Sequence, residues 1–409
     1  MLGILPLVVT VVVAGWRNWQ FDADYYASFV SRVSGCRTTV GDVTFVRPGT
    51  VRLEQVRIED TETGKLFLFL PRIDVRQADQ SVLLSIPEAH VQNSAGDRVL
   101  FVVHERVLRQ PDLLTVPIIV TIDQIHFNGR QIDTSDTSPK GTTRLVDNRF
   151  EFRQFNQGSE LRGELRPSDS RGPHSIELTV RRTFGELPAT TIALQTHEHW
   201  LAANLLIGQQ KWLPQLSASA KFCGDLYIDV DANGWSGEVF GRFHAVDLGQ
   251  LIGDRFGGFV TGNANAVVRT ARFANSRVQE IDVDVDAGPG EFGTRQLKAA
   301  VETWQLQWSE PPGLDKASIA YEKLAISLFL TKDGLEMAGC CERDNGTLLT
   351  LRSGAVLGHP GLLSVEAPVP SIISVLLPTE PPPRFHISAE ADALLRVLPL
   401  PSANTEGPM

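Results

Sequence analysis

Apolar and polar residues alternate along much of this chain, a pattern typical of β-strands that turn one face to a core and the other to water. Two segments show it most strictly. Their apolar positions are Leu226, Ile228 and Val230 in the first segment and Ile281, Val283 and Val285 in the second. The intervening positions are Tyr227, Asp229, Asp231, Asp282, Asp284 and Asp286. We predict that each segment is a strand with one apolar and one polar face.

Further short segments with strand character follow one another between glycines and prolines. The predicted strands cover residues 43–45, 51–58, 66–70, 73–75, 86–91, 99–103, 118–127, 175–181, 191–196, 226–231, 264–268, 278–285, 299–308, 317–330 and 348–351. This pattern predicts a mainly β fold with a long, curved antiparallel sheet and a few short helices. A closed sandwich or barrel would bury the apolar face, whereas an open sheet would leave it as a trough. The period alone fits both arrangements.

A helical period predicts one helix near the N-terminus and a few shorter patches. Residues 23–34 form the predicted helix, which Asp22 can cap and Gly35 can end. Shorter helical patches are expected at 200–206 and 246–253. The apolar face of the first helix would carry Tyr25, Tyr26, Phe29, Val30 and Val33.

A tight turn and an irregularity are predicted in the strands that follow this helix. Pro48 and Gly49 occupy the two central positions of the segment 47–50, which is the signature of a type II turn. Farther along, the alternation slips by one position at Gln55, and such a slip indicates a β-bulge.

The first residues form an uncharged, mostly apolar run over positions 2–16. Fifteen helical residues reach about 22 Å, less than the roughly 30 Å of a bilayer core. The run could be a cleaved signal peptide, a membrane anchor or a buried core segment. No basic residue precedes it, and its cleavage-site match is weak, so we favour an anchor helix within residues 1–20. The anchor residues would be Leu5, Val9 and Val12 in the apolar run and Trp16 and Trp19 at the membrane interface.

Polar, breaker-rich loops suggest how the rest of the chain is divided. The loops at 134–143 and 167–173 predict an N-terminal β region over 21–140 and a C-terminal β region over 141–378. Residues 379–409 begin with a proline-rich stretch and are predicted to form an extended tail.

Composition excludes several classes of protein. The 409 residues carry 38 Lys+Arg and 48 Asp+Glu, and this net charge of −10 argues against nucleic acid as the main partner. Four cysteines in a chain of this length exclude a disulfide scaffold, and their pairing is left open by the sequence. The mean hydropathy of −0.05 excludes a membrane protein with many spans.

Two motifs could hold a nucleotide or a cation, but their surroundings argue against both. Residues 288–293 match GxGxxG, yet the preceding strand alternates with three aspartates that would repel a pyrophosphate. We predict a hairpin turn there. The aspartates do not fit an EF-hand loop, because Ala287 and Gly293 stand where glycine and glutamate are needed. A solvated strand face explains them better.

Histidines and cysteines do not assemble into a recognisable site in the sequence. On a strand, His197 and His199 would share a face, but two ligands do not make a metal site, so we expect surface histidines and no metal. Cys340 and Cys341 would lie on opposite faces of a strand, and buried free thiols are a fair expectation. No motif of a nucleophilic or phosphate-binding enzyme is present, and we expect no cofactor.

Three stretches resemble the AsmA-like family of bacterial envelope proteins. TVGDVTFVRPGTVRLEQVRIED (39–60), after the apolar run and short helix, resembles the opening strands of that family. GWSGEVFGRFHAVDLGQLIG (234–253) and FGGFVTGNANAVV (256–268) resemble its C-terminal region. YEKLAISLFLTKDGLEMAGC (321–340) through VPSIISVLLP (369–378) resembles its closing strands and last helix.

The resemblance implies an inner-membrane anchor, a periplasmic body and a β-taco groove, related in kind to that of TamB and YhdP, that shields lipid acyl chains. We therefore expect a non-enzymatic envelope protein that binds or conducts phospholipid or another envelope lipid and supports outer-membrane biogenesis. Two alternatives remain: a scaffold for outer-membrane proteins that acts through sheet edges, and a polysaccharide-active enzyme that uses paired carboxylates. An open trough would favour lipid, and a polar cleft with facing carboxylates would favour the enzyme.

Overall fold

The computed structural model confirms a mainly β chain with few, short helices, and it forms two compact units. The first unit comprises Met1–Gln210 and Asp225–Ala232, and the second comprises Lys211–Gly224 and Asn233–Met409. The structure describes residues 23–61, 63–78, 80–92, 108–109, 116–128, 143–169, 172–203, 205, 219–232, 234–253, 260–275, 277–309, 316–341, 346–359, 365–376 and 398–399.

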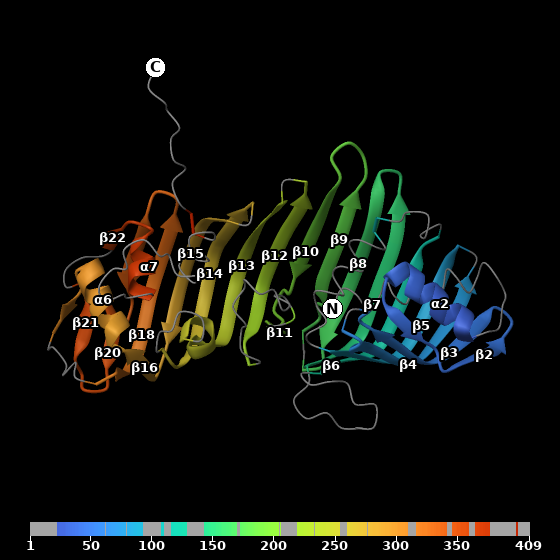
Figure 1. The fold of residues 1–409 in the computed structure, drawn as a ribbon, viewed down its shortest axis with the longest axis horizontal. Helices are drawn as coiled ribbons and strands as arrows, with labels where there is room; N and C mark the ends of the chain where they lie inside the picture. The colour runs from blue at the N-terminus through green and yellow to red at the C-terminus, as the bar shows by residue number, and fades with distance from the viewer. Residues whose placement is uncertain are drawn as a thin grey trace, which may run out of the picture. The chain divides into compact units, whose positions relative to one another are not determined.

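The first unit is a sheet with one described helix (Figure 1). Helix α2 spans Ala23–Ser34. The strands are β1 (Arg37–Thr39), β2 (Asp42–Arg47), β3 (Thr50–Glu59), β4 (Leu66–Ala78), β5 (Ser81–Gln92), β6 (Ile118–Asn128), β7 (Thr143–Phe155), β8 (Gly158–Pro167), β9 (Ile176–Thr183), β10 (Ala189–Gln195), β11 (Leu201–Ala202) and part of β12 (Lys221–Asp231).

Strand pairing in the first unit follows the chain from β3 to β10 and then continues to β12. All described pairs here are antiparallel except β5 and β6, which run parallel. One face of this sheet is a closed core in which Leu53, Leu70, Ile86, Val120 and Phe152 are completely buried. Tyr26 and Val30 of α2 belong to the same core. The apolar face of these strands is therefore a dry interior.

The predicted turn and helix are confirmed, whereas the predicted bulge takes another form. Gly49 has φ 75°, as a type II turn requires at its second central position. Gln55 takes the left-handed conformation, and the buried side chains slip from Leu53 to Val56. The register with β4 nevertheless continues, because Glu54 pairs with Arg72 and Val56 with Leu70. The buried positions are therefore three residues apart on both strands. Neither strand contains the extra residue that defines a β-bulge.

The second unit is built around β18, the long strand Ser318–Thr331. Strands β13 (Gly234–Asp247), β14 (Asn263–Ala274) and β15 (Arg277–Ala287) pair in succession, and β15 pairs with β18. The remaining strands are β16 (Gly290–Gly293), β17 (Gln307–Trp308), β19 (Leu335–Gly339), β20 (Thr347–Leu351), β21 (Val356–Gly358) and β22 (Val365–Ala367). Its helical elements are η4 (Gly249–Gly253), α6 (Thr294–Trp304) and α7 (Ser371–Leu376).

Helices α6 and α7 contribute to a core that includes the β18 and β20 part of this sheet. Leu297 and Ala300 of α6 share a buried cluster with Tyr321 and Leu349, and Val375 of α7 belongs to it. The indole N–H of Trp304 donates to the hydroxyl of Ser371 at 3.1 Å and links the two helices. Figure 1 shows both helices beside β18, β20 and β21.

Two predictions for the region after β15 were wrong. Residues 299–308 were expected to be a strand, but helix α6 occupies Thr294–Trp304 and the short strand β17 follows. The segment 288–293 is not a hairpin turn, since β15 and β16 both run antiparallel to β18 as two parts of one strand line. A Cβ at Gly290 would lie 2.0 Å from the carbonyl oxygen of Thr261, so close backbone packing explains this glycine.

The other predicted elements have mixed outcomes. Within 200–206, Leu201–Ala202 form strand β11 and Leu205 is helical, whereas the patch at 246–253 ends in the helical segment η4. The strand at 99–103 and the anchor residues 1–20 lie outside the described residues. In the tail, Leu398 is described and packs in a cluster with Leu330 and Val369. Among the described helices, none has the length and apolar character needed to cross a membrane.

Candidate ligand-binding face

The six predicted groove residues fall in two different compact units. Leu226, Ile228 and Val230 lie in the β12 segment of the first unit. Ile281, Val283 and Val285 lie in β15 of the second unit. All six are half-buried.

The β12 set continues the core face of the first unit. Leu226 lies opposite Leu194, and Ile228 lies opposite Ile192, on the neighbouring strand β10. Leu226 and Ile228 pack against the first unit's core as partly buried members.

The polar residues of β12 lie on its other face, as predicted. Thr191 donates a hydrogen bond to the Asp229 carboxylate at 2.7 Å, and the Gln195 amide donates to the Tyr227 hydroxyl at 2.9 Å. The alternation is therefore confirmed for this strand.

The β15 set belongs to a larger apolar face of the second unit's sheet. Val283 lies opposite Val268 of β14 and Leu328 of β18, and Val268 lies opposite Gly241 of β13. The cross-strand rows on either side of this one are also apolar. The name apolar face is used below for Val239, Gly241, Phe243, Ala266, Val268, Ala271, Ile281, Val283, Val285, Ile326, Leu328 and Leu330.

Buried clusters reach the apolar face at both ends and, through Leu328, also in its middle row. At one end, Leu248, Leu251 and Ile252 share a cluster that reaches Val285. At the other, Val369 and Leu398 share a cluster that reaches Ile281. Val268 and Val283 lie between these ends and are half-buried. None of the positions that define this face carries a charge or a hydrogen-bonding side chain, so the face can hold hydrocarbon but gives a polar ligand nothing to bind.

Aromatic rings lie at two places along β13. Trp235 contacts Phe273 with ring centroids 4.6 Å apart, and Phe222 contacts Phe243 at 4.9 Å. Between these two places lie Val239 opposite Ala271 and Gly241 opposite Val268, whereas Ala266 is the direct partner of Phe243. These two rows carry smaller side chains than the aromatic rings on either side.

The opposite face of the same strands is polar and laced with ion pairs. Arg269 binds both Asp282 and Asp284, and these bonds raise the pKa of its guanidinium, chiefly through Asp282. Arg272 pairs with Glu238 at 2.6 Å and Glu280 at 3.2 Å. Exposed ion pairs of this kind add little stability, but their charged side chains keep this face solvated.

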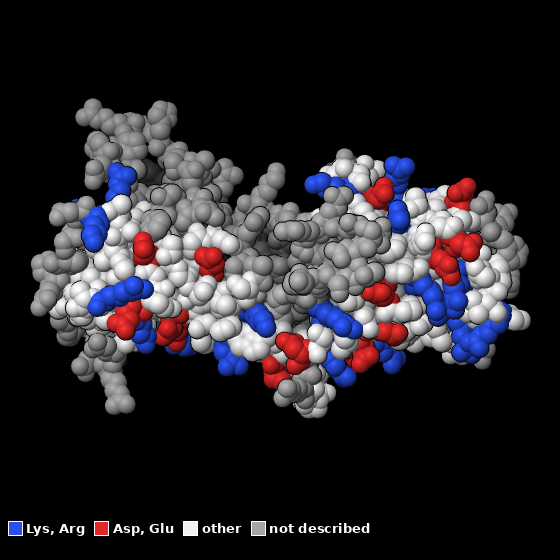
Figure 2. All heavy atoms as spheres, turned by 90° about the horizontal axis from the view of Figure 1, so that it is seen from below, with Lys and Arg blue, Asp and Glu red and all other residues white. Residues whose placement is uncertain are grey.

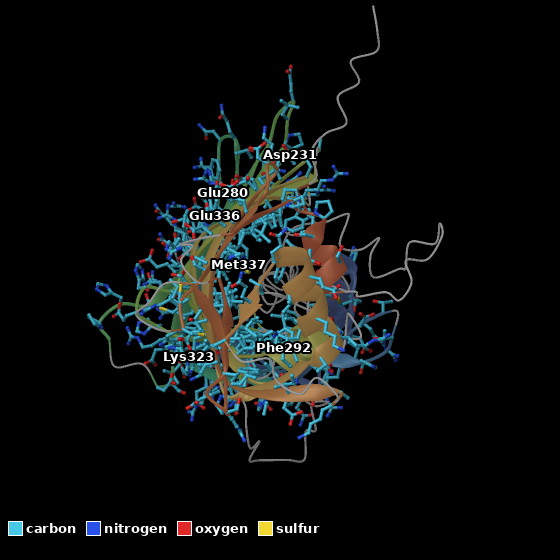
Figure 3. The ribbon with its side chains drawn as sticks, turned by 90° about the vertical axis from the view of Figure 1, so that its left-hand side faces the viewer. Asp231, Glu280, Phe292, Lys323, Glu336 and Met337 are labelled. Atoms are coloured by element: carbon cyan, nitrogen blue, oxygen red, sulfur yellow. The ribbon has the colours of Figure 1, made fainter. Side chains whose placement is uncertain are left out.

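Figure 3 shows how side chains of the second unit are separated between the two faces of its sheet. In Figure 3, Glu280, Lys323 and Glu336 point away from the helices, whereas Phe292 and Met337 point toward them. Met337 is buried and Glu336 exposed, in agreement with this view. Figure 2 shows acidic and basic side chains interspersed on the side that it draws.

A hollow of ≈ 490 Å³ on the polar face bears on the enzyme alternative. Phe329, Glu336 and Glu366 line it in one cross-strand row, and Asp333 adds a third carboxylate. Glu336 and Glu366 are both exposed. A general acid is typically held in an apolar pocket that raises its pKa, and exposed carboxylates lack that environment.

The histidines singled out in the sequence lie beyond the end of β10, so the two-residue period of a strand does not apply to them. His199 is buried, contrary to the prediction of a surface residue, and its Nε2 lies 2.5 Å from the carbonyl oxygen of His174. His197 is exposed and lies 3.6 Å from Glu177. No group of three His, Cys, Asp or Glu side chains among the described residues is arranged to hold a metal.

Sequence reasoning missed the β13 and β14 contributions to the apolar face. Along β13 the alternation holds from Val239 through Gly241 to Phe243, and the exposed Arg242 lies between the last two. An extra residue between Val268 and Ala271 breaks the alternation of β14, and one between Phe243 and Val246 breaks that of β13.

Comparison of the chain with protein-family models, curated proteins and solved structures finds no match.

Proposed function

We propose that this protein is a non-enzymatic, membrane-anchored envelope protein that binds lipid acyl chains on the apolar face of its second unit. The observation that carries the proposal is the half-burial of Val268 and Val283 in a face without charge. The equivalent face of the first unit is closed, with Val120 and Ile122 completely buried. A mainly apolar surface that stays partly accessible is suited to a hydrocarbon ligand.

The energetics fit a ligand that is recognised by surface area. Removing a methylene from water is worth about 0.8 kcal/mol, so covering about ten methylenes contributes about 8 kcal/mol before the cost of ordering the chain. Rows of Val, Ile, Leu, Ala and Gly can supply this contact without a specific hydrogen bond. A phospholipid or another envelope lipid would keep its headgroup in water. The expected anchor in residues 1–20 would hold this face near a membrane of the envelope.

A pair of adjacent valines allows a sharp test of lipid binding. Val268 lies on the apolar face, and Val267 is 44% exposed on the polar face. Val268→Trp would place a large ring in the row of Gly241 and Val283 on the apolar face, whereas Val267→Trp would add the same ring to the other side. The full chain would be purified in mild detergent, and its bound lipid would be extracted and quantified by mass spectrometry.

We expect co-purified lipid to fall severalfold in Val268→Trp and to stay at the wild-type level in Val267→Trp. Circular dichroism would verify that both variants are folded. Equal lipid in all three proteins, or none in the wild type, would contradict the proposal.

A scaffold function remains the second candidate, and a sheet edge favours it. Strand β2 lies at the end of the first unit's strand order and exposes 47% of Val46. An extended segment of an envelope protein partner could add to this edge by β-augmentation. Loss of a partner after Val46→Pro, with lipid content unchanged, would support this function instead.

A further inference from the structure

Three titratable side chains meet on the face of the first unit opposite its core, across β5 and β6. One carboxylate oxygen of Glu88 lies 3.2 Å from Nε2 of His90 and 3.2 Å from Nε2 of His126. The two imidazoles are direct partners in the parallel register and stack with centroids 5.2 Å apart and planes 16° apart.

The arrangement of the two imidazoles and the carboxylate favours proton binding over metal coordination. The ring nitrogens of stacked imidazoles direct their in-plane lone pairs nearly in parallel, whereas a metal needs them to converge on one point. A carboxylate placed equally close to two ring nitrogens can instead attract a proton on either His90 or His126. The cluster thus joins one acidic and two basic side chains in direct contact across the seam.

Cations flank this cluster on both sides. On β4, Phe69 contacts His90 at 5.9 Å, and Arg57 of β3 lies 5.8 Å from the Phe69 ring. On β7, Arg144 is the direct partner of His126. A row across five strands therefore contains two guanidiniums and two imidazoles, with the carboxylate beside the central pair.

Burial sets the direction of titration. The pKa of His126 is lowered, first by burial and further by His90 and Arg144, while Glu88 partly offsets this. Its Nε2 is buried and makes no hydrogen bond of good geometry within the described residues. Because the folded pKa lies below the unfolded value, the unfolded chain binds more protons as the pH falls. The stability from neutral His126 is present above the unfolded pKa and is lost as the pH falls through the folded pKa.

We infer that Glu88, His90 and His126 form a proton-operated switch in the seam between β5 and β6. At neutral pH the uncharged His126 ring stacks on the His90 ring and holds the two strands together. In mild acid, a proton on His126 places an imidazolium next to Arg144 at a site where burial disfavours the charge, and this cost loosens the seam. The same strands bear Val91 and Phe127 on the core side, so loosening exposes buried apolar surface. This inference does not depend on lipid binding.

Hydrogen exchange of the full-length protein tests the switch. Protection of residues 81–92 and 118–128 would be measured by mass spectrometry at pH 7.5 and 5.5, after correction for intrinsic exchange rates. We expect a severalfold loss of protection at pH 5.5 in the wild type and little change in His126→Gln. His197→Gln is the matched control, because His197 is an exposed histidine near a glutamate in the same unit. This control should behave as the wild type.

A second variant keeps the test decisive if His126→Gln does not fold. Glu88→Gln removes the charge that raises the pKa of His126. The pH at which protection is lost should therefore move lower. Equal loss in wild type and His126→Gln, loss spread evenly over other strands, or no shift in Glu88→Gln would overturn the inference. Protection that requires added Zn²⁺ would also overturn it in favour of a metal site.

Discussion

Val268 and Val283 lie directly opposite each other on β14 and β15, and both side chains are half-buried on the apolar face of the second unit. Their neighbours Val267 and Asp284 are also direct partners, but on the polar face. A single step along either strand thus moves from the apolar face to the polar face. The predictions below test this difference and the packing around it.

Charge on the apolar face should cost less than charge in the closed core. Val120→Asp places a carboxylate at a completely buried position of β6 and should destabilise the first unit by more than about 3 kcal/mol. Val283→Asp should cost the second unit only about 1–2 kcal/mol, because water can reach the half-buried site. Urea denaturation followed by circular dichroism measures both. A cost for Val283→Asp as large as that for Val120→Asp would show a dry interior.

One buried hydroxyl should matter to the stability of the second unit. Tyr321 is completely buried, and its hydroxyl donates to the carbonyl oxygen of Thr261 at 2.7 Å. Tyr321→Phe should lower the free energy of unfolding by about 1–2 kcal/mol, because that carbonyl loses its partner.

The control for this change is Tyr227→Phe on the exposed polar face of β12. Its hydroxyl accepts from Gln195, and its loss should alter stability by less than about 0.5 kcal/mol. Thermal unfolding compares the two variants. Equal effects would mean that the Tyr321 hydrogen bond contributes nothing beyond an exposed one.

The four cysteines should differ in reactivity. All are free thiols, and Cys340 is exposed while Cys36, Cys223 and Cys341 are buried. Burial raises the pKa of the Cys341 thiol, which keeps it protonated and unreactive near neutral pH. Timed alkylation of the folded protein at pH 7.5 should therefore label one site quickly, and Cys340→Ser should abolish that fast phase. Rapid labelling of Cys341 in native protein would contradict the packing described here.

The anchor expected in residues 1–20 also remains a prediction. The full chain should fractionate with membranes, resist a carbonate wash and keep its N-terminus. Val9→Arg with Val12→Arg should release it, since a basic residue at a helix centre in the bilayer costs about 2.5–3.5 kcal/mol. Val43→Arg, on the short strand β2, is a control that should stay bound. A processed, freely soluble wild-type product would identify a signal peptide instead.

Strict alternation of apolar and polar residues allowed part of the fold to be predicted from the sequence. The apolar and polar faces of β12 and of β15 were predicted correctly. The alternation of apolar and polar residues is unbroken from Leu226 to Asp231 and from Ile281 to Asp286. Helix α6 was missed because Trp304, Leu306 and Trp308 fit a two-residue period, while Leu297, Ala300, Val301 and Trp304 also fit a helical one. Packing of Leu297 and Ala300 on Tyr321 decides between these periods, and that contact is not local.

The candidate sites depend still more on distant pairing. His90 and His126 are 36 positions apart and meet because β5 and β6 pair in parallel with His90 opposite His126. No local pattern gives that register. The apolar face likewise depends on the pairing of β13 with β14, where an extra residue between Val268 and Ala271 changes which β14 side chains share the face.

In-cell photo-crosslinking tests the lipid proposal most directly. A photoreactive amino acid would replace Val283 on the apolar face and, in a separate protein, Asp284 on the polar face. Ile228 and Asp229 would serve as the corresponding pair on β12 of the first unit. After irradiation of intact cells, mass spectrometry of the purified chains would identify the adducts. The proposal predicts lipid adducts at position 283 and few at 284, with both proteins folded. Equal labelling at 283 and 284, or no lipid adduct at either position, would contradict it.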